Sequence, residues 1–90
     1  MTPAERPSIR SGVRLQWEAV QNGYVLLYPE GMVKLNTSAA EILRRCDGIR
    51  SVDDIVADLE ATFKRGGLQD DVLRFLELAT AQGWIDAPQS

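Results

Sequence analysis

The chain contains no histidine and only one cysteine, Cys46, among its 90 residues. The lack of histidine removes the commonest general base and the commonest metal ligand. One cysteine cannot form an internal disulfide, and without histidine it leaves no ligand set for zinc or an iron–sulfur cluster. The composition therefore predicts no catalytic residue, no metal site and no cofactor. Cys46 lies among apolar helix positions, so we interpret it as a small buried hydrophobe.

Long apolar runs and an excess of positive charge are also missing. No run approaches the roughly 18 residues of a membrane-spanning helix, and the amino terminus lacks the apolar core of a signal peptide. The formal net charge of −3 offers no bulk attraction to nucleic acid or anionic lipid. These absences predict a cytoplasmic protein with neither a membrane nor a nucleic acid as its partner.

A chain of 90 residues has room for one domain. Residues 1–12 carry two prolines, two serines and no periodicity, so we expect a flexible N-terminal tail there. Residues 13–87 are predicted to form a single domain.

Three short strands are predicted at residues 13–17, 24–28 and 32–35. In the first, apolar residues alternate with polar ones, as in a strand with one buried face. Asn22-Gly23 then indicates a hairpin, and Pro29-Glu30-Gly31 indicates a second turn. The three strands therefore form an antiparallel meander, and the strand at residues 32–35 has one neighbour and one free edge.

Three helices follow the strands. The first begins at Asn36, Thr37 or Ser38, since Ser38 and Glu41 are spaced as a capping box but either earlier residue could equally be the cap. The second begins at Ser51 and includes Lys64 and Arg65 in its last turn. The third runs from about residue 69 to residue 82. The core-facing positions recur at the helical period and are Ala39, Ile42, Leu43, Cys46, Val52, Ile55, Val56, Leu59, Phe63, Leu68, Val72, Phe75, Leu76 and Ala79.

Segregated strands and helices define an α+β fold that is winged helix-turn-helix-like, with a three-stranded antiparallel β-meander followed by three α-helices. A winged helix-turn-helix raises the alternative of a DNA-binding transcriptional regulator. Its recognition helix would present Gln69, Asp70 and Asp71 to the bases. Two carboxylates there would be repelled by the phosphates, so this reading is disfavoured.

Peptide recognition is the function that the pattern favours. A free strand edge beside a helix can accept an extended peptide as an added strand, with main-chain hydrogen bonds for affinity and side-chain pockets for selectivity. The predicted peptide-binding residues lie on the third strand and the third helix. They are Met32, Val33, Lys34, Leu35, Asp71, Arg74, Phe75, Leu78 and Gln82.

Three stretches carry a resemblance to a known family. The run LLYPEGMVKLNTSAAEIL at residues 26–43, CDG at residues 46–48 and SVDDIV at residues 51–56 resemble the coenzyme PQQ synthesis protein D family, a prototype of the recognition element used in ribosomal peptide modification (RiPP). The likeness covers about residues 13–85.

The resemblance implies a protein that is not an enzyme. It implies a peptide chaperone that binds the precursor peptide of pyrroloquinoline quinone and presents it to a radical S-adenosylmethionine (SAM) enzyme of the same pathway. The family groove would correspond to residues 32–35 and 71–82. A homodimer formed by exchange of the β-hairpins is a further hypothesis, because the meander is apolar on both faces and joined to the helices by a short link.

Overall fold

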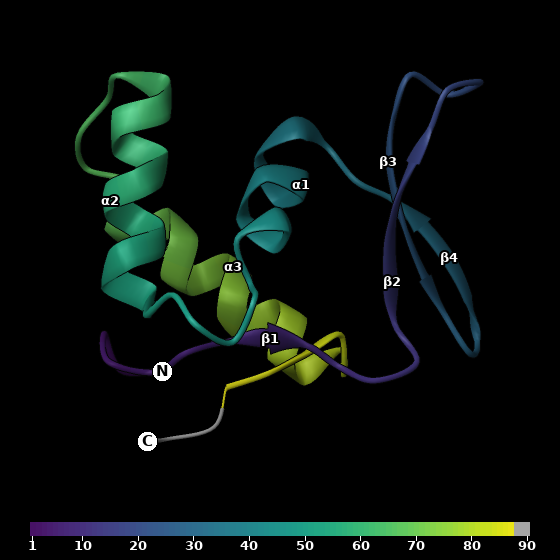
Figure 1. Cartoon of the computed structure of the whole chain (residues 1–90), viewed down its shortest axis with the longest axis horizontal. Coiled ribbons are helices and arrows are strands. Elements are labelled where there is room, and N and C mark those ends of the chain that lie inside the picture. The colour runs from purple at the N-terminus through teal and green to yellow at the C-terminus, as the bar shows by residue number, and fades with distance from the viewer. Residues whose placement is uncertain (88–90) are drawn as a thin grey trace.

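The computed structural model describes residues 1–87 and has a three-stranded sheet followed by three helices (Figure 1). The sheet contains strands β2 (Arg14–Glu18), β3 (Gly23–Tyr28) and β4 (Gly31–Lys34), in the order β2-β3-β4. The helices are α1 (Thr37–Arg44), α2 (Val52–Phe63) and α3 (Gln69–Ala81). The predicted α+β class and the antiparallel meander are confirmed.

Turn residues set the register of the meander. Asn22 adopts a positive φ of 51° in the four-residue loop between β2 and β3, a conformation that asparagine tolerates better than most residues. β3 and β4 pair from Tyr28 with Gly31 to Val25 with Lys34, so Pro29 and Glu30 form the tip of a two-residue hairpin. Both turns occur where the sequence predicts them.

The helix ends settle one open alternative and correct one boundary. Asn36, one of the three expected candidates, is the N-cap of α1, and its side-chain oxygen accepts a hydrogen bond of 2.8 Å from the amide of Ala39. The capping box is instead at the start of α2, where Ser51 and Asp54 bond reciprocally. α2 ends at Phe63 because Lys64 adopts the left-handed conformation, with φ of 54°. The last turn therefore does not include Lys64 and Arg65.

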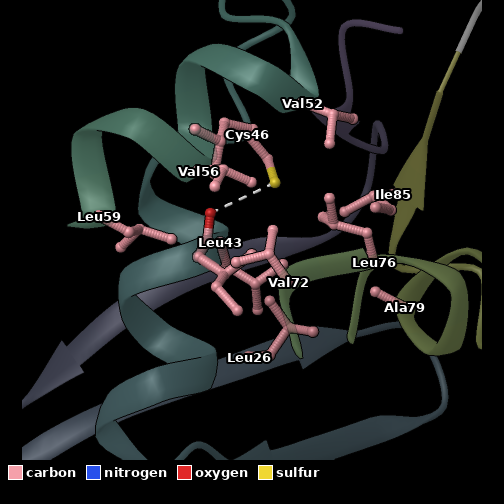
Figure 2. Packing of buried hydrophobic residues seen from close by; sticks show 12 residues of the cluster. Leu26, Leu43, Cys46, Val52, Val56, Leu59, Val72, Leu76, Ala79 and Ile85 are labelled. Atoms are coloured by element: carbon pink, nitrogen blue, oxygen red, sulfur yellow. Dashed lines mark hydrogen bonds between the residues drawn. The ribbon is translucent and has the colours of Figure 1, made fainter. Parts of the chain in front are cut away.

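The core lies between the sheet and the three helices. Figure 2 shows Leu26 of β3 at one side of the cluster and Cys46 at the other, with Leu43 of α1 and Val72 of α3 between them. The Cys46 Sγ donates a hydrogen bond to the Ile42 carbonyl, and burial raises the pKa of this thiol to about 12. A thiol that stays protonated is unreactive, so its interpretation as a buried hydrophobe is confirmed.

The first residues correct the expectation of a flexible tail. β1 (Ser8–Ile9) pairs antiparallel with β5 (Ile85–Asp86) and forms a second, two-stranded sheet. The carbonyls of Pro3 and Glu5 accept hydrogen bonds from the amides of Asp53 and Val52 at the start of α2. These amides lack partners within the helix, so the N-terminal segment satisfies them and is part of the fold.

Within residues 1–87, no helix combines the length and the apolar character needed to cross a membrane.

Candidate functional site

The open edge of β4 is the central feature of the candidate site. Within residues 1–87, β4 is paired on one side only, with β3. The amide of Leu35 donates to the carbonyl of Tyr24 at 3.0 Å, which fixes the phase of the ladder. Antiparallel pairs alternate between hydrogen-bonded and non-hydrogen-bonded. The main-chain groups of Val33 therefore point toward β3, and those of Met32 and Lys34 point toward the open edge.

The side chains of this strand divide between the two faces of the sheet. Val33 pairs with Leu26, so both lie on the core face, and Val33 and Leu35 pack partly buried against the core. Met32 and Lys34 point to the opposite face, where both are exposed. A peptide added to β4 would alternate in the same way. Half of its side chains would face the helices, and the other half would face solvent beside Met32 and Lys34.

Helix α3 forms the wall on the core face. Phe75 is partly buried against the same core as Val33 and Leu35. Leu78 is 51% exposed, as its position off the apolar stripe predicts. After the helix, the Trp84 ring lies 6.4 Å from the Tyr28 ring at the β3–β4 hairpin. The hairpin is thus held against the C-terminal end of α3.

The remaining predicted residues, Asp71, Arg74 and Gln82, lie in the first turn, in the middle and at the C-cap of α3. Gln82 follows the helix as its C-cap and is exposed. Asp71 and Arg74 form an ion pair of 3.8 Å in which both side chains are more than 70% exposed. A pair this exposed contributes little to stability. The structure brings Val33, Leu35 and Phe75 to one core, whereas Arg74 and Gln82 lie on the outer surface of α3.

A pocket of about 280 Å³ opens between the three helices and was not predicted from the sequence. It lies between the first turn of α1, the end of α2 and the start of α3, and Asp71 is one of its lining residues. Its members are distant in sequence and most resemble ordinary core positions, so no local signal marks them. The lining residues are Thr37, Ser38, Ile42, Leu59, Phe63, Arg65, Leu68, Asp71 and Val72.

An ion-pair network holds α1 against α2 beside this pocket. Arg45, at the end of α1, donates hydrogen bonds to Asp58 of α2 at 2.5 Å and to Glu41 of α1 at 2.8 Å. Its side chain is only 13% exposed. The hydrogen bonds from Arg45 lower the pKa of both carboxyl groups. Arg45 therefore fixes the distance between two of the three helices that line the pocket.

The described part of the chain contains no group of three or more histidine, cysteine, aspartate or glutamate residues arranged to hold a metal ion. The features that the fold does provide are an unpaired strand edge, an apolar wall and a pocket. These define a small winged-helix-like domain with a surface suited to an extended peptide.

Comparison with known proteins places this domain in a family. Residues 23–85 match the family described as coenzyme PQQ synthesis protein D. The chain belongs to the coenzyme PQQ synthesis protein D family. Two relatives named PqqA binding protein cover 89% of this chain and 88% of their own length. The one from Stutzerimonas stutzeri is 54% identical and the one from Azotobacter vinelandii is 56% identical, each over 81 residues.

A solved structure has the same fold. It is the solution structure of the PqqD truncation of Methylobacterium extorquens PqqCD, described as a functional and stand-alone RiPP recognition element. The two chains superpose with a TM-score of 0.76 at 29% identity, over 89% of this chain and 87% of the other. The family resemblance seen in the sequence is thus confirmed.

Proposed function

We propose that this protein binds the PqqA precursor peptide by adding it as a fourth strand along the open edge of β4. The observation that carries the proposal is the outward direction of the main-chain groups of Met32 and Lys34, next to the partly buried side chains of Val33 and Leu35. Main-chain pairing would supply affinity, and the apolar face toward α3 would select the side chains. The names of the relatives support PqqA as the peptide.

The proposed role is that of a chaperone rather than an enzyme. The protein would hold the peptide extended and present it to the radical SAM enzyme of pyrroloquinoline quinone biosynthesis, which supplies the chemistry. The cytoplasm remains the predicted location of this step. The acidic first turn of α3, with Asp70 and Asp71 exposed, supports the peptide over DNA as the ligand.

Amide hydrogen exchange with and without synthetic PqqA peptide tests the binding mode. We expect the amides of Met32 and Lys34 to become protected, since they gain partners only in the complex. The amide of Val33 is already paired with β3 and should change little. Protection confined to Arg14–Glu18 would refute the proposal, as would a complex that leaves Met32 and Lys34 unprotected.

Two partner hypotheses extend the proposal. Size-exclusion chromatography with PqqA and the radical SAM enzyme should show a ternary complex, and co-elution of PqqA with the enzyme alone would contradict a presenting role. The hairpin-exchanged homodimer stays a prediction. Light scattering over a concentration series checks it, and a monomeric mass throughout would contradict it.

A further inference from the structure

The pocket between the three helices has an apolar interior that no described residue fills. Its walls come from Ile42 of α1, Leu59 and Phe63 of α2, Leu68 of the α2–α3 link and Val72 of α3. Leu59 and Val72 also belong to the buried core, and Figure 2 shows both side chains directed into the same cluster. The pocket is therefore a shallow extension of the core that is open to the surface.

Phe63 is the observation that points to a missing occupant. It lies on the apolar stripe of α2, four residues after Leu59 and seven after Val56, which is the spacing of a core-facing residue. Nevertheless it is 42% exposed, whereas Leu59, one turn earlier, is 3% exposed. Both side chains line the pocket, and Phe63, the last residue of α2, is the one that stays exposed at its opening. An apolar side chain placed in the pocket would complete the burial of this ring.

The position of the pocket connects it to the strand edge. Thr37 and Ser38, which line its mouth, follow the last residue of β4 by three and four positions. A strand advances about 3.3 Å per residue, so a peptide paired with β4 reaches the mouth within a few residues. The charged members of the lining, Arg65 and Asp71, carry opposite signs, so together they favour neither an anionic nor a cationic occupant.

We propose that this pocket receives one bulky apolar side chain of the same precursor peptide whose main chain pairs with β4. The inference rests on the proposed function and adds a second recognition element to it. Strand addition is insensitive to sequence, because it uses main-chain groups. The pocket supplies selectivity for a large apolar residue at a fixed distance from the paired segment.

Calorimetric titration with synthetic PqqA peptide tests the inference on the full chain. Ser38→Trp fills the mouth of the pocket, and Phe63→Ala removes part of its wall. We expect each to weaken PqqA binding about tenfold, the loss of one anchoring side chain. The matched control is Ile49→Ala, which truncates an apolar side chain that is 71% exposed and does not line the pocket. It should leave the affinity within about twofold.

A series of PqqA peptides with single alanine substitutions identifies the occupant. The peptide residue that fills the pocket should lose affinity for the wild-type protein but not for Phe63→Ala, which a double-mutant cycle detects as a coupling. The position of that peptide residue relative to the segment paired with β4 also shows whether the peptide runs parallel or antiparallel to β4. In an antiparallel complex it lies on the N-terminal side of that segment, because the pocket follows the C-terminal end of β4.

The outcomes separate this inference from the proposed function. Unchanged PqqA affinity in Ser38→Trp and Phe63→Ala, with wild-type binding intact and weakened by Lys34→Pro, overturns the pocket but leaves strand addition standing. If Ser38→Trp changes the oligomeric mass of the protein, the occupant of the pocket is a second copy of the chain. That result also overturns the inference that the pocket binds PqqA. Absence of PqqA binding to the wild-type protein overturns the proposed function, and the inference with it.

Discussion

The sheet has two outer strands, β2 and β4, whose outer edges have no strand partner within residues 1–87. Each presents the main-chain groups of alternate residues. On β4 these residues are Met32 and Lys34. On β2 they are Leu15 and Trp17, because Gln16 pairs with Val25, whose main-chain groups point away from β4. The main chain alone therefore does not distinguish the two edges.

The surroundings of the two edges differ. The chain leaves β4 directly into the residues that line the pocket, and the hairpin beside β4 contacts Trp84 after α3. On the β2 side, the half-exposed Trp17 ring stacks edge-on against Tyr24 at 5.2 Å, and Arg44 lies over that same Tyr24 ring. Because the two edges offer the same main-chain groups, any preference of a peptide for β4 must come from the side chains beside that edge.

The largest expected effect comes from truncating Leu26, the buried residue of β3 that pairs with both outer strands. Leu26 pairs with Leu15 on one side and with Val33 on the other, and it is fully buried. Leu26→Ala should lower the free energy of unfolding by about 3 kcal/mol, through lost burial and the cavity left behind. Chemical denaturation measures this. Leu27→Ala, on the opposite face of the same strand, is the control, and an equal loss there would contradict the placement of the core.

A proline on each edge separates the two edges directly. Lys34→Pro removes an outward amide without breaking a bond to β3, and it should weaken PqqA binding about tenfold relative to Lys34→Ala. Trp17→Pro removes the equivalent amide on β2 and should match Trp17→Ala in affinity. Calorimetry gives the two ratios. A larger loss of affinity from Trp17→Pro than from Lys34→Pro, each relative to its alanine variant, would place the peptide on β2 and contradict the proposal.

The next comparison is between two neighbouring arginines, Arg45 with a largely buried side chain and Arg44 with an exposed one. Arg45→Met should destabilise the fold more than Arg44→Met does, because it removes the hydrogen bonds from a largely buried guanidinium to Asp58 and Glu41, although Glu41 keeps its ion pair with Arg44. Arg44→Met, whose side chain is 49% exposed, should cost about 0.5 kcal/mol or less. Denaturation curves of the two variants make the comparison, and equal losses would contradict the special role of Arg45.

The same network predicts an acid dependence. Arg45 lowers the pKa of Glu41 and Asp58 in the folded chain, so the unfolded chain binds protons first as the pH falls. The stabilisation is complete above the ordinary carboxyl pKa of about 4 and is lost as the pH falls through the lowered folded values. Stability measured from pH 6 down to pH 2 should therefore decline less steeply for Arg45→Met. Parallel curves would contradict this.

The smallest expected effect concerns the aromatic surface of β2. Trp17→Ala should change PqqA affinity by less than about twofold, since the ring lies on the strand away from the predicted guest. In the variant Trp84→Phe, Trp17 is the only tryptophan. The fluorescence of that variant should likewise change little when PqqA binds. A strong quench in that variant would indicate that the peptide reaches β2.

Local signals explain why most of the fold could be predicted. Asn22-Gly23 and Pro29-Glu30-Gly31 fix two turns, and the helical period identifies the core stripes. The pairing of Ser8 with Asp86 could not be predicted because each strand has two residues and its partner lies at the other end of the chain. The end of α2 could not be placed from the sequence because the left-handed conformation that ends the helix falls on Lys64, a residue type that seldom adopts it, before the chain reaches Gly67, where φ is also positive.

The candidate site was predictable in part. The free edge follows from counting strands, so residues 32–35 could be proposed from sequence. The direction of each main-chain group needs the observed register, and the pocket needs three helices in place. Phe63 illustrates the limit, because periodicity shows that it lies on the core-facing stripe and cannot show that the space beside it is open.

The pairing of β1 with β5 has a mechanical consequence. Ser8 lies opposite Asp86, so the segment before β1 and the segment after β5 leave this ladder at the same end. Tension applied to the two chain ends would load its hydrogen bonds one after another, as in a zipper, rather than all at once. A pull on the N-terminus would first load the bonds of Pro3 and Glu5 to α2, and a pull on either terminus would open the β1–β5 ladder before the load reaches the strand that we propose carries the peptide.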